Sequence, residues 1–104
     1  MFEISYNSDL EAAKMKYPFM TMPDETEITH SSIYEENNCE KIKVYIERPV
    51  DGGFINATCI LPSYSWQNNG FSDNEIKEFQ DIIEKGVHVI YKFARQGGFG
   101  NAVN

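Results

Sequence analysis

Residues 72–98 read SDNEIKEFQDIIEKGVHVIYKFARQGG and carry the strongest helix signal of the chain. The segment opens with a capping box, in which the side chains of Ser72 and Glu75 can each accept a hydrogen bond from the other residue's backbone amide. Its apolar residues recur with the spacing of one helical face, and they are Ile76, Phe79, Ile83, Val87, Ile90 and Ala94. Gly97-Gly98 stands where a helix usually ends. We therefore predict one long C-terminal helix with an apolar face.

Residues 87–93 also permit a second reading. Lys85-Gly86 could end the helix, after which a last strand would carry Val87, Val89, Tyr91 and Phe93 on one face. We favour the single helix because Ile90 faces inward only in that reading, and because Ala94-Arg95-Gln96 before Gly97 is typical of a helix end. Gly86 would then lie on the buried side, where its missing side chain lets the helix approach a sheet.

A β-hairpin is predicted over residues 41–61. Residues 41–47 alternate, with Ile42, Val44 and Ile46 on one face and Lys41, Lys43, Tyr45 and Glu47 on the other. Asp51-Gly52, followed by Gly53, predicts the turn. The returning strand over residues 54–61 can point inward Ile55, Ala57, Cys59 and Leu61. This hairpin would supply the centre of a sheet.

The remaining elements follow from weaker signals. Residues 2–6 can form a short strand, and the capping box Ser8-Asp9-Leu10-Glu11 opens a short helix that Tyr17-Pro18 ends. Residues 20–23 are predicted as a connection. Residues 26–34 are predicted as a strand that places on one side Ile28, His30, Ser32 and Tyr34. Residues 62–71 are predicted as a long aromatic connection.

These elements predict a single α+β domain over residues 1–104. Their order is β-α-β-β-β-α, which indicates an antiparallel meander sheet with the helices, including the long C-terminal one, packed on one face. The tail over residues 97–104 is predicted to be flexible. At 104 residues the chain is long enough to bury one core without metal or disulfide.

Composition and charge exclude several classes of protein. A hydrophobic content of 41% with 13% aromatic residues is too high for an intrinsically disordered chain. Sixteen acidic residues against nine basic ones give a net charge of −7, which disfavours direct nucleic-acid binding. The chain has neither a basic start followed by an apolar run nor an apolar stretch of about 18 residues. We expect a soluble cytoplasmic protein without a membrane partner.

Residues with catalytic or metal-binding side chains are present without the spacing that such sites need. Cys39, Cys59, His30 and His88 show no C-x-x-C or H-x-x-x-H pattern. We expect Cys59 to be a small buried apolar residue, His88 to lie on the polar face of the helix and Cys39 to lie in a turn as a reduced thiol. The sequence therefore predicts no catalytic residues, no metal and no cofactor.

One segment of unusual charge is a candidate partner-binding surface. Residues 24–40 contain no Lys or Arg and hold Asp24, Glu25, Glu27, Glu35, Glu36 and Glu40. On a strand, Glu25 and Glu27 would lie about 6 to 7 Å apart on one face, a repeat close to that of backbone phosphates. Such a surface could occupy a basic nucleic-acid channel or the active cleft of a toxin. The alternative is an ordinary solubilising face.

The aromatic residues of the connection over residues 62–71 are the second candidate. Tyr64, Trp66 and Phe71 belong to the residue types that dominate the energetics of protein interfaces. The alternative is that they fold down as a lid over the open end of the sheet, because they are largely apolar.

Part of the chain resembles the N-terminal domain of HicB-type antitoxins. The resemblance rests on Asp51-Gly52-Gly53-Phe54, on Leu61-Pro62 and on Gly70-Phe71-Ser72 with Glu75 opening a helix, and it covers residues 42–95. The preceding helix and third strand depart from the order usual in that family. The resemblance implies inhibition of a small ribonuclease partner.

These observations favour a non-enzymatic protein-binding module, an inhibitor or accessory protein of antitoxin, immunity or phage and mobile-element type. It would dock on a basic protein, such as a nucleic-acid-processing enzyme or a toxin. The expected contact residues are Tyr64, Trp66, Phe71, Glu25, Glu27, Glu35 and Glu36. Two alternatives remain: a small enzyme or ligand-binding protein with a pocket beneath residues 62–71 and His30 or Cys59 as the reactive group, and a structural subunit that forms a homodimer through a sheet edge.

Overall fold

The computed structural model describes residues 10–96, which form a sheet of six strands and a long helix. The strands are β1 (Tyr17–Thr21), β2 (Glu27–His30), β3 (Tyr34–Glu36), β4 (Cys39–Val50), β5 (Gly53–Leu61) and β6 (Ser65–Asn69), and the helix is α2 (Asp73–Arg95). Residues 10–14 are also helical, and we call them the N-terminal helical segment. The strand predicted over residues 2–6 and the tail predicted over residues 97–104 lie outside the described residues.

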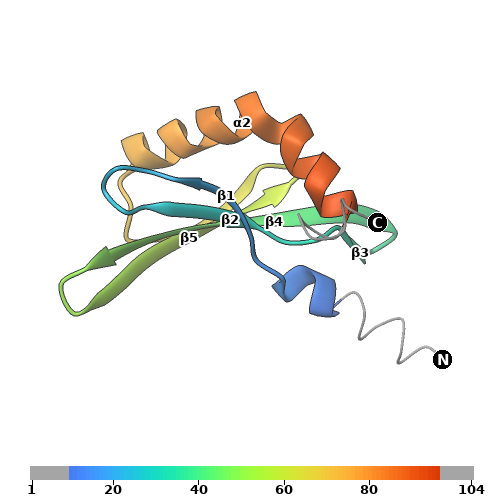
Figure 1. Cartoon of the computed structure of the whole chain (residues 1–104), viewed down its shortest axis with the longest axis horizontal. Coiled ribbons are helices and arrows are strands. Elements are labelled where there is room, and N and C mark those ends of the chain that lie inside the picture. The colour runs from blue at the N-terminus through green and yellow to red at the C-terminus, as the bar shows by residue number, and fades with distance from the viewer. Residues whose placement is uncertain (1–9, 97–104) are drawn as a thin grey trace.

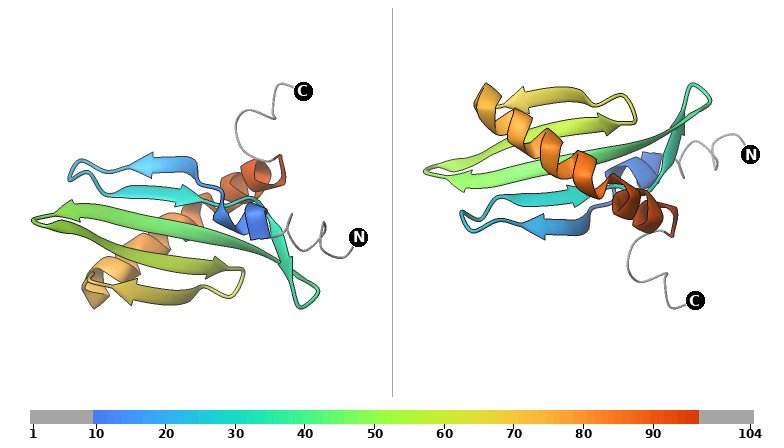
Figure 2. Two further views of the ribbon diagram at one scale, coloured as in Figure 1. Left: turned by 90° about the horizontal axis from the view of Figure 1, so that it is seen from below. Right: turned by 90° about the horizontal axis from the view of Figure 1, so that it is seen from above.

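The sheet is antiparallel, with the strand order β1-β2-β4-β5-β6 and with β3 paired to the start of β4. Helix α2 crosses one face of this sheet, and the N-terminal helical segment lies on the opposite face (Figure 1; both faces are seen in Figure 2). The α+β class and the long helix packed on one face are therefore confirmed. The prediction that both helices share a face is wrong. We call the face opposite α2 the outer face.

The core lies between α2 and the central hairpin. Strands β4 and β5 pair in register along their length, with Val44 opposite Cys59 and Ile46 opposite Ala57. Alternate residues of the two strands therefore face α2, and the most deeply buried of them are Ile42, Val44, Ile46, Ala57, Cys59 and Leu61. Gly52 has a φ of 85°, which suits the glycine of the predicted turn. The hairpin prediction is confirmed.

Helix α2 continues without interruption through Gly86, the residue at which the alternative reading of the sequence would have ended it. The capping box at its start is complete, because Glu75 N donates to Ser72 Oγ over 3.2 Å and Ser72 N donates to Glu75 Oε1 over 3.1 Å. A Cβ atom built on Gly86 would lie 2.6 Å from Phe19 Cζ, so the missing side chain lets Phe19 of β1 pack against the helix. The single-helix reading of residues 87–93 is confirmed.

Arg48 ties the start of α2 to the turn between β1 and β2. Its guanidinium lies 2.8 Å from a carboxylate oxygen of Glu75 and 3.2 Å from one of Asp24, and its Nε donates to the hydroxyl of Thr26 over 2.8 Å. The guanidinium also stacks 5.0 Å from the ring centroid of Phe71. These contacts hold together three segments that are distant in the sequence.

Two strands form where connections were predicted. β1 lies within the predicted helix end and connection, and it pairs with β2 with a bulge between Pro18 and Met20. Pro18 can occupy this edge strand because no ladder donor is needed there. β6 lies in the predicted aromatic connection and pairs with the free edge of β5. Its sequence, SWQNN, ends in two asparagines, a residue type that is rare in strands. Pairing with a neighbouring strand stabilises both elements against the proline of β1 and the asparagines of β6.

The strand predicted over residues 26–34 is divided in two. Ser31 follows β2, and its Oγ accepts a hydrogen bond from Lys43 N over 3.0 Å while its backbone amide donates to Lys43 O over 2.9 Å. The Ser31 hydroxyl thus takes the place of a backbone acceptor, and the regular ladder ends. Tyr34, in β3, consequently lies on the outer face, opposite to Ile28 and His30.

Candidate functional site

The polar residues of β4, which alternate with its buried residues, lie on the outer face of the sheet. Lys41, Lys43, Tyr45 and Glu47 point away from α2, and their neighbours on β5 include Thr58 and Ile60. β3 folds over one end of this face, because it returns against the first residues of β4. The outer face is therefore concave at this end, and α2 does not cover it because the helix lies on the opposite face.

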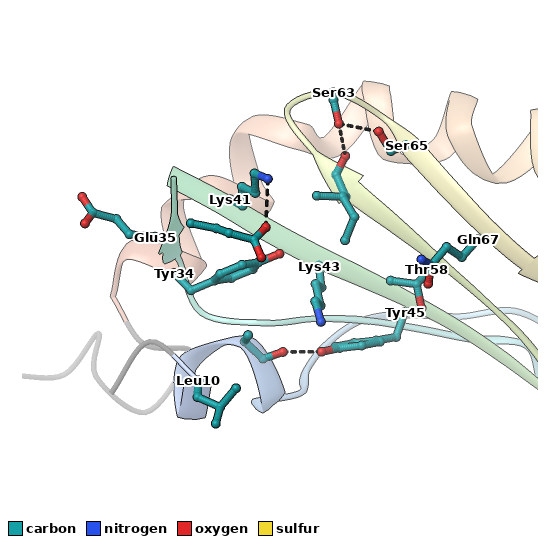
Figure 3. Close-up of a pocket in the computed structure, with 13 residues that line it drawn as sticks. Leu10, Tyr34, Glu35, Lys41, Lys43, Tyr45, Thr58, Ser63, Ser65 and Gln67 are labelled. Carbon is teal, nitrogen blue, oxygen red and sulfur yellow. Dashed lines mark hydrogen bonds and ion pairs between the residues drawn. The ribbon is translucent and has the colours of Figure 1, made fainter. Parts of the chain in front are cut away.

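One hollow of about 610 Å³ lies where β3 and the N-terminal helical segment overhang the outer face. We call it the tyrosine hollow, and Figure 3 shows the side chains around it. The polar or aromatic side chains that line it are Tyr34, Glu35, Glu36, Lys41, Lys43, Tyr45, Thr58, Ser63, Ser65 and Gln67. Its volume is typical of sites that take small organic molecules.

The N-terminal helical segment is held on the outer face by two residues of β4. The hydroxyl of Tyr45 donates a hydrogen bond to the carbonyl oxygen of Ala13. Lys16 Nζ lies 3.3 Å from a carboxylate oxygen of Glu47 and 4.9 Å from the ring centroid of Tyr45. These contacts explain why this segment does not join α2 on the other face, as the sequence pattern had led us to expect.

Burial disfavours the ionised form of both tyrosines in this hollow. Desolvation raises the pKa of Tyr34, and the nearby charge of Glu36 raises it further. Desolvation also raises the pKa of Tyr45. Both phenols therefore keep their protons near neutral pH and act as hydrogen-bond donors. Lys43 Nζ stands 5.9 Å from the ring centroid of Tyr34, so a cation and a phenol lie side by side.

A second hollow, of about 440 Å³, lies at the β4–β5 turn end of the outer face. We call it the acidic hollow, and it is lined by Thr21, Glu25, Glu27, Glu47, Pro49 and Phe54. Glu27 stands directly opposite Glu47 in the β2–β4 register, an arrangement of like charges that is unfavourable in a sheet. Phe54 is 68% exposed, more than any other large apolar residue that the structure describes.

The acidic residues predicted to contact a partner lie in two separate places. Glu25 and Glu27 line the acidic hollow, whereas Glu35 and Glu36 belong to β3 and line the tyrosine hollow. Glu25 is not in a strand as expected, because it has a φ of 71° and its amide donates to Met22 O over 2.9 Å in a turn. Lys41 Nζ lies 2.9 Å from Glu36 Oε1, and this hydrogen bond lowers the pKa of Glu36. The segment over residues 24–40 is therefore not one continuous acidic surface.

The aromatic residues of the predicted loop pack beneath α2. Trp66 pairs with Cys59 across β5 and β6, which directs it to the helix side, and its Nε1 donates to Gln80 Oε1 over 2.9 Å. Phe71 is 5% exposed and meets Phe79 edge-on, with 5.0 Å between ring centroids. Tyr64 is half-buried against the same core. Phe71 therefore belongs to the core and not to an exposed loop, because its ring fills the space under the start of α2.

The reactive side chains considered from the sequence lie away from both hollows. His30 is 1% exposed and Cys59 is fully buried, both on the α2 side of the sheet, while Cys39 and His88 are exposed. Burial raises the pKa of Cys59 to about 12, so its thiol stays protonated and unreactive. Within residues 10–96 no group of three or more His, Cys, Asp or Glu side chains is arranged to hold a metal ion.

Sequence reasoning missed three residues of these hollows. Tyr34 was placed on the wrong side of its strand, because nothing local shows that Ser31 ends β2. Lys43 was placed on the correct face, but no pattern showed that β3 would cover that face. Phe54 alternates with the inward-facing Ile55 at the start of the returning strand, and this alternation is the signal that could have identified it as exposed.

Comparison with known proteins gives no match for this chain among family models, curated proteins or solved structures. Neither of the helical parts that the structure describes is long and apolar enough to cross a membrane.

Proposed function

We propose that this chain is a non-enzymatic module that binds a basic protein partner through the acidic hollow. The observation that carries the proposal is the convergence of Glu25, Glu27 and Glu47 on one hollow beside the exposed ring of Phe54. Carboxylates around an exposed aromatic ring suit a Lys or Arg side chain and its apolar stem. A partner surface that presents such side chains would therefore fit this end of the sheet.

The placement of the charges supports a basic partner in particular. Glu27 and Glu47 lie opposite each other on neighbouring strands, and their like charges repel. Lys16 reduces this repulsion by an ion pair with Glu47, but it forms none with Glu27. A cation from a partner that approaches Glu25 and Glu27 would remove repulsion that the free protein retains. The net charge of −7 would also accelerate encounter with a positively charged protein.

In this proposal Phe54 is the aromatic contact residue, a role that the sequence analysis assigned to the aromatic connection over residues 62–71. Tyr64, Trp66 and Phe71 contact α2 or the core, whereas the ring of Phe54 is free of such contacts over most of its surface. Exposed aromatic residues that become buried are frequent sources of binding energy at interfaces. An inhibitor of an enzyme whose active cleft is basic, such as a ribonuclease, is one partner class that this chemistry would serve.

The test is affinity capture from a nuclease-treated lysate of the source cell with the full chain and two variants. Glu27→Gln removes one carboxylate of the acidic hollow, and Phe54→Ala removes its aromatic ring. Glu78→Gln, exposed on α2, and Met20→Ala, an apolar residue with 40% exposure on β1, are the matched controls. We expect a basic protein in stoichiometric amount with the wild type and both controls.

The two hollow variants should retain that protein at least about tenfold less well, the loss expected for an interface hot spot. Its affinity for the wild type should fall with added salt, and the salt dependence should be flatter for Glu27→Gln. Equal retention by all variants would refute the acidic hollow as the binding surface.

A further inference from the structure

The tyrosine hollow contains hydrogen-bond donors that the described residues leave without acceptors. Tyr34 is 6% exposed as a whole residue and lines the hollow, and no hydrogen bond joins its hydroxyl to another residue in the range 10–96. In Figure 3, Tyr34 projects from β3 across the hollow toward β4. A hydroxyl that faces a hollow can exchange its bound water for an acceptor atom of a ligand. A ligand with an acceptor atom can therefore bind this hydroxyl from the hollow.

The charge of the hollow indicates which group that is. Lys43 Nζ has no carboxylate oxygen within 4.0 Å among the described residues, although the Lys43 charge is close enough to lower the pKa of Glu36. Glu36 is itself bound to Lys41 over 2.9 Å, and Glu35, which also lines the hollow, forms no ion pair with Lys43. Lys43 is thus the cation on the floor of the hollow that lacks a direct ion pair.

The remaining lining favours a ligand that is flat and partly apolar. The rings of Tyr34 and Tyr45 and the side chains of Ile60 and Leu10 supply apolar surface, and Thr58 and Gln67 add polar groups at the same level of the sheet. A volume of about 610 Å³ holds a molecule of several tens of atoms at most. One positive charge beside aromatic surface suits an organic anion better than a bare inorganic ion.

We propose that the tyrosine hollow binds a small organic carboxylate with a flat apolar body. The carboxylate would lie between Lys43 Nζ and the Tyr34 hydroxyl, accepting a hydrogen bond from each, and the apolar body would rest against Tyr45 and Ile60. This site is separate from the acidic hollow and does not depend on it. It has a charge preference opposite to that of the acidic hollow, so the two proposals can fail independently.

The experiment is an NMR titration of the full ¹⁵N-labelled chain with phenylacetate as the probe. Two analogues of nearly the same shape, 2-phenylacetamide and 2-phenylethylamine, replace the carboxylate with a neutral amide and with a cation. We expect saturable shifts of amides around Tyr34, Lys43 and Thr58 with phenylacetate, with a dissociation constant in the millimolar range usual for fragments. The amide should bind about tenfold more weakly, because it lacks the charge-assisted hydrogen bond.

Three variants examine the contacts one at a time. Lys43→Met keeps the length of the side chain and should weaken phenylacetate binding about tenfold, the effect of losing a hydrogen bond to a charged group. Tyr34→Phe removes only the hydroxyl and should weaken it about threefold. Glu36→Gln should tighten it about twofold, since it removes a nearby negative charge and releases Lys41. A loss of folding in a variant could not produce this last increase in affinity.

The controls are Lys92→Met and Tyr91→Phe, which make the same chemical changes on α2, on the other side of the sheet. Both should bind phenylacetate as the wild type does. Three results would overturn the proposal: equal affinity for phenylacetate and 2-phenylacetamide, shifts that map outside the tyrosine hollow, or no saturable shift at tens of millimolar probe. Binding that Lys43→Met leaves unchanged would overturn the placement of the carboxylate.

Discussion

Cys39 and Cys59 lie on the same hairpin in opposite environments. Cys39 is exposed at the start of β4, and Cys59 is fully buried on β5 against the residues that pack under α2. Desolvation holds the Cys59 thiol in its protonated form. A catalytic role for Cys59 in the folded protein would need both exposure and a thiolate, and it has neither.

We predict that one thiol of the folded protein reacts with an aromatic disulfide reagent and that the second reacts only on unfolding. Cys39 should account for the fast phase, which Cys39→Ser should abolish. Cys59 should react at a rate limited by opening of the structure, because its pKa is near 12 and no surface of it is exposed. The measurement is a stopped-flow trace with and without denaturant. Rapid modification of both thiols in the native protein would contradict the burial of Cys59.

At the scale of elements, the segment between β6 and α2 positions the start of the helix. The side chain of Asn68 brackets Phe71, since its Nδ2 donates to Phe71 O over 2.7 Å and its Oδ1 accepts from Phe71 N over 3.0 Å. Gly70, between them, has a φ of 122°, and a Cβ atom on it would lie 2.5 Å from Ile55 Cγ2 and 2.7 Å from Ile55 Cβ. Only glycine allows the chain to turn so close to β5 and bring Phe71 into the core.

We predict that Gly70→Ala destabilises the fold by about 2 to 4 kcal/mol, from the strained φ and the overlap with Ile55 together. Gly52→Ala is the matched control. Its φ of 85° is also unfavourable for alanine, but a Cβ atom there would meet nothing within 4 Å. It should cost about 1 kcal/mol. Urea unfolding monitored by Trp66 fluorescence would measure both, and equal losses would show that contact with Ile55 is unimportant.

At the scale of the whole molecule, three titratable groups make the stability of the fold depend on pH. Hydrogen bonds from Thr26, together with the charge of Arg48, lower the pKa of Asp24 at the β1–β2 turn. The backbone hydrogen bond from Ser72 and the contact with Arg48 lower the pKa of Glu75 at the start of α2. Desolvation lowers the pKa of His30, beneath α2, from its ordinary value of 6.5. Each of these groups binds protons less readily in the folded protein than in the unfolded chain.

We predict that the free energy of unfolding falls as the pH is lowered, in two stages. The unfolded state takes up a proton on His30 below about pH 6.5 that the folded state resists. The carboxylates contribute stability that is present above their ordinary pKa values, 3.8 for Asp24 and 4.5 for Glu75, and that is lost as the pH falls through their lowered folded values. Urea unfolding between pH 8 and pH 3 would measure both stages.

A variant separates the two stages. His30→Asn should remove the loss between about pH 6.5 and pH 5 and retain the loss at lower pH, because asparagine does not titrate. His88→Asn, a change at an exposed histidine of α2, should give the wild-type profile. A stability that is constant or rises between pH 7 and pH 5 would contradict the burial of neutral His30.

Short-range signals were enough to predict α2 and the β4–β5 hairpin. The capping box of Ser72 and Glu75, the helical spacing of apolar residues after it and the two-residue alternation around Asp51-Gly52 are all read within a few residues, and the structure contains each of these elements. The place of Gly86 on the packed side of the helix follows from the same spacing. These elements could be predicted because, in each of them, the apolar residues recur with the period of the backbone itself, which is about 3.6 residues in a helix and two in a strand.

Tertiary structure alone decided the edges of the sheet and both hollows. β1 contains Pro18 and β6 ends in two asparagines, and both strands form where a neighbouring strand offers backbone groups to pair with. Tyr34 reaches the outer face because the Ser31 side chain ends β2, and the N-terminal helical segment lies there because Tyr45 binds Ala13. Such contacts join residues far apart in the chain, so no local pattern records them. The surfaces proposed here for a basic partner and for an organic anion arise from those contacts.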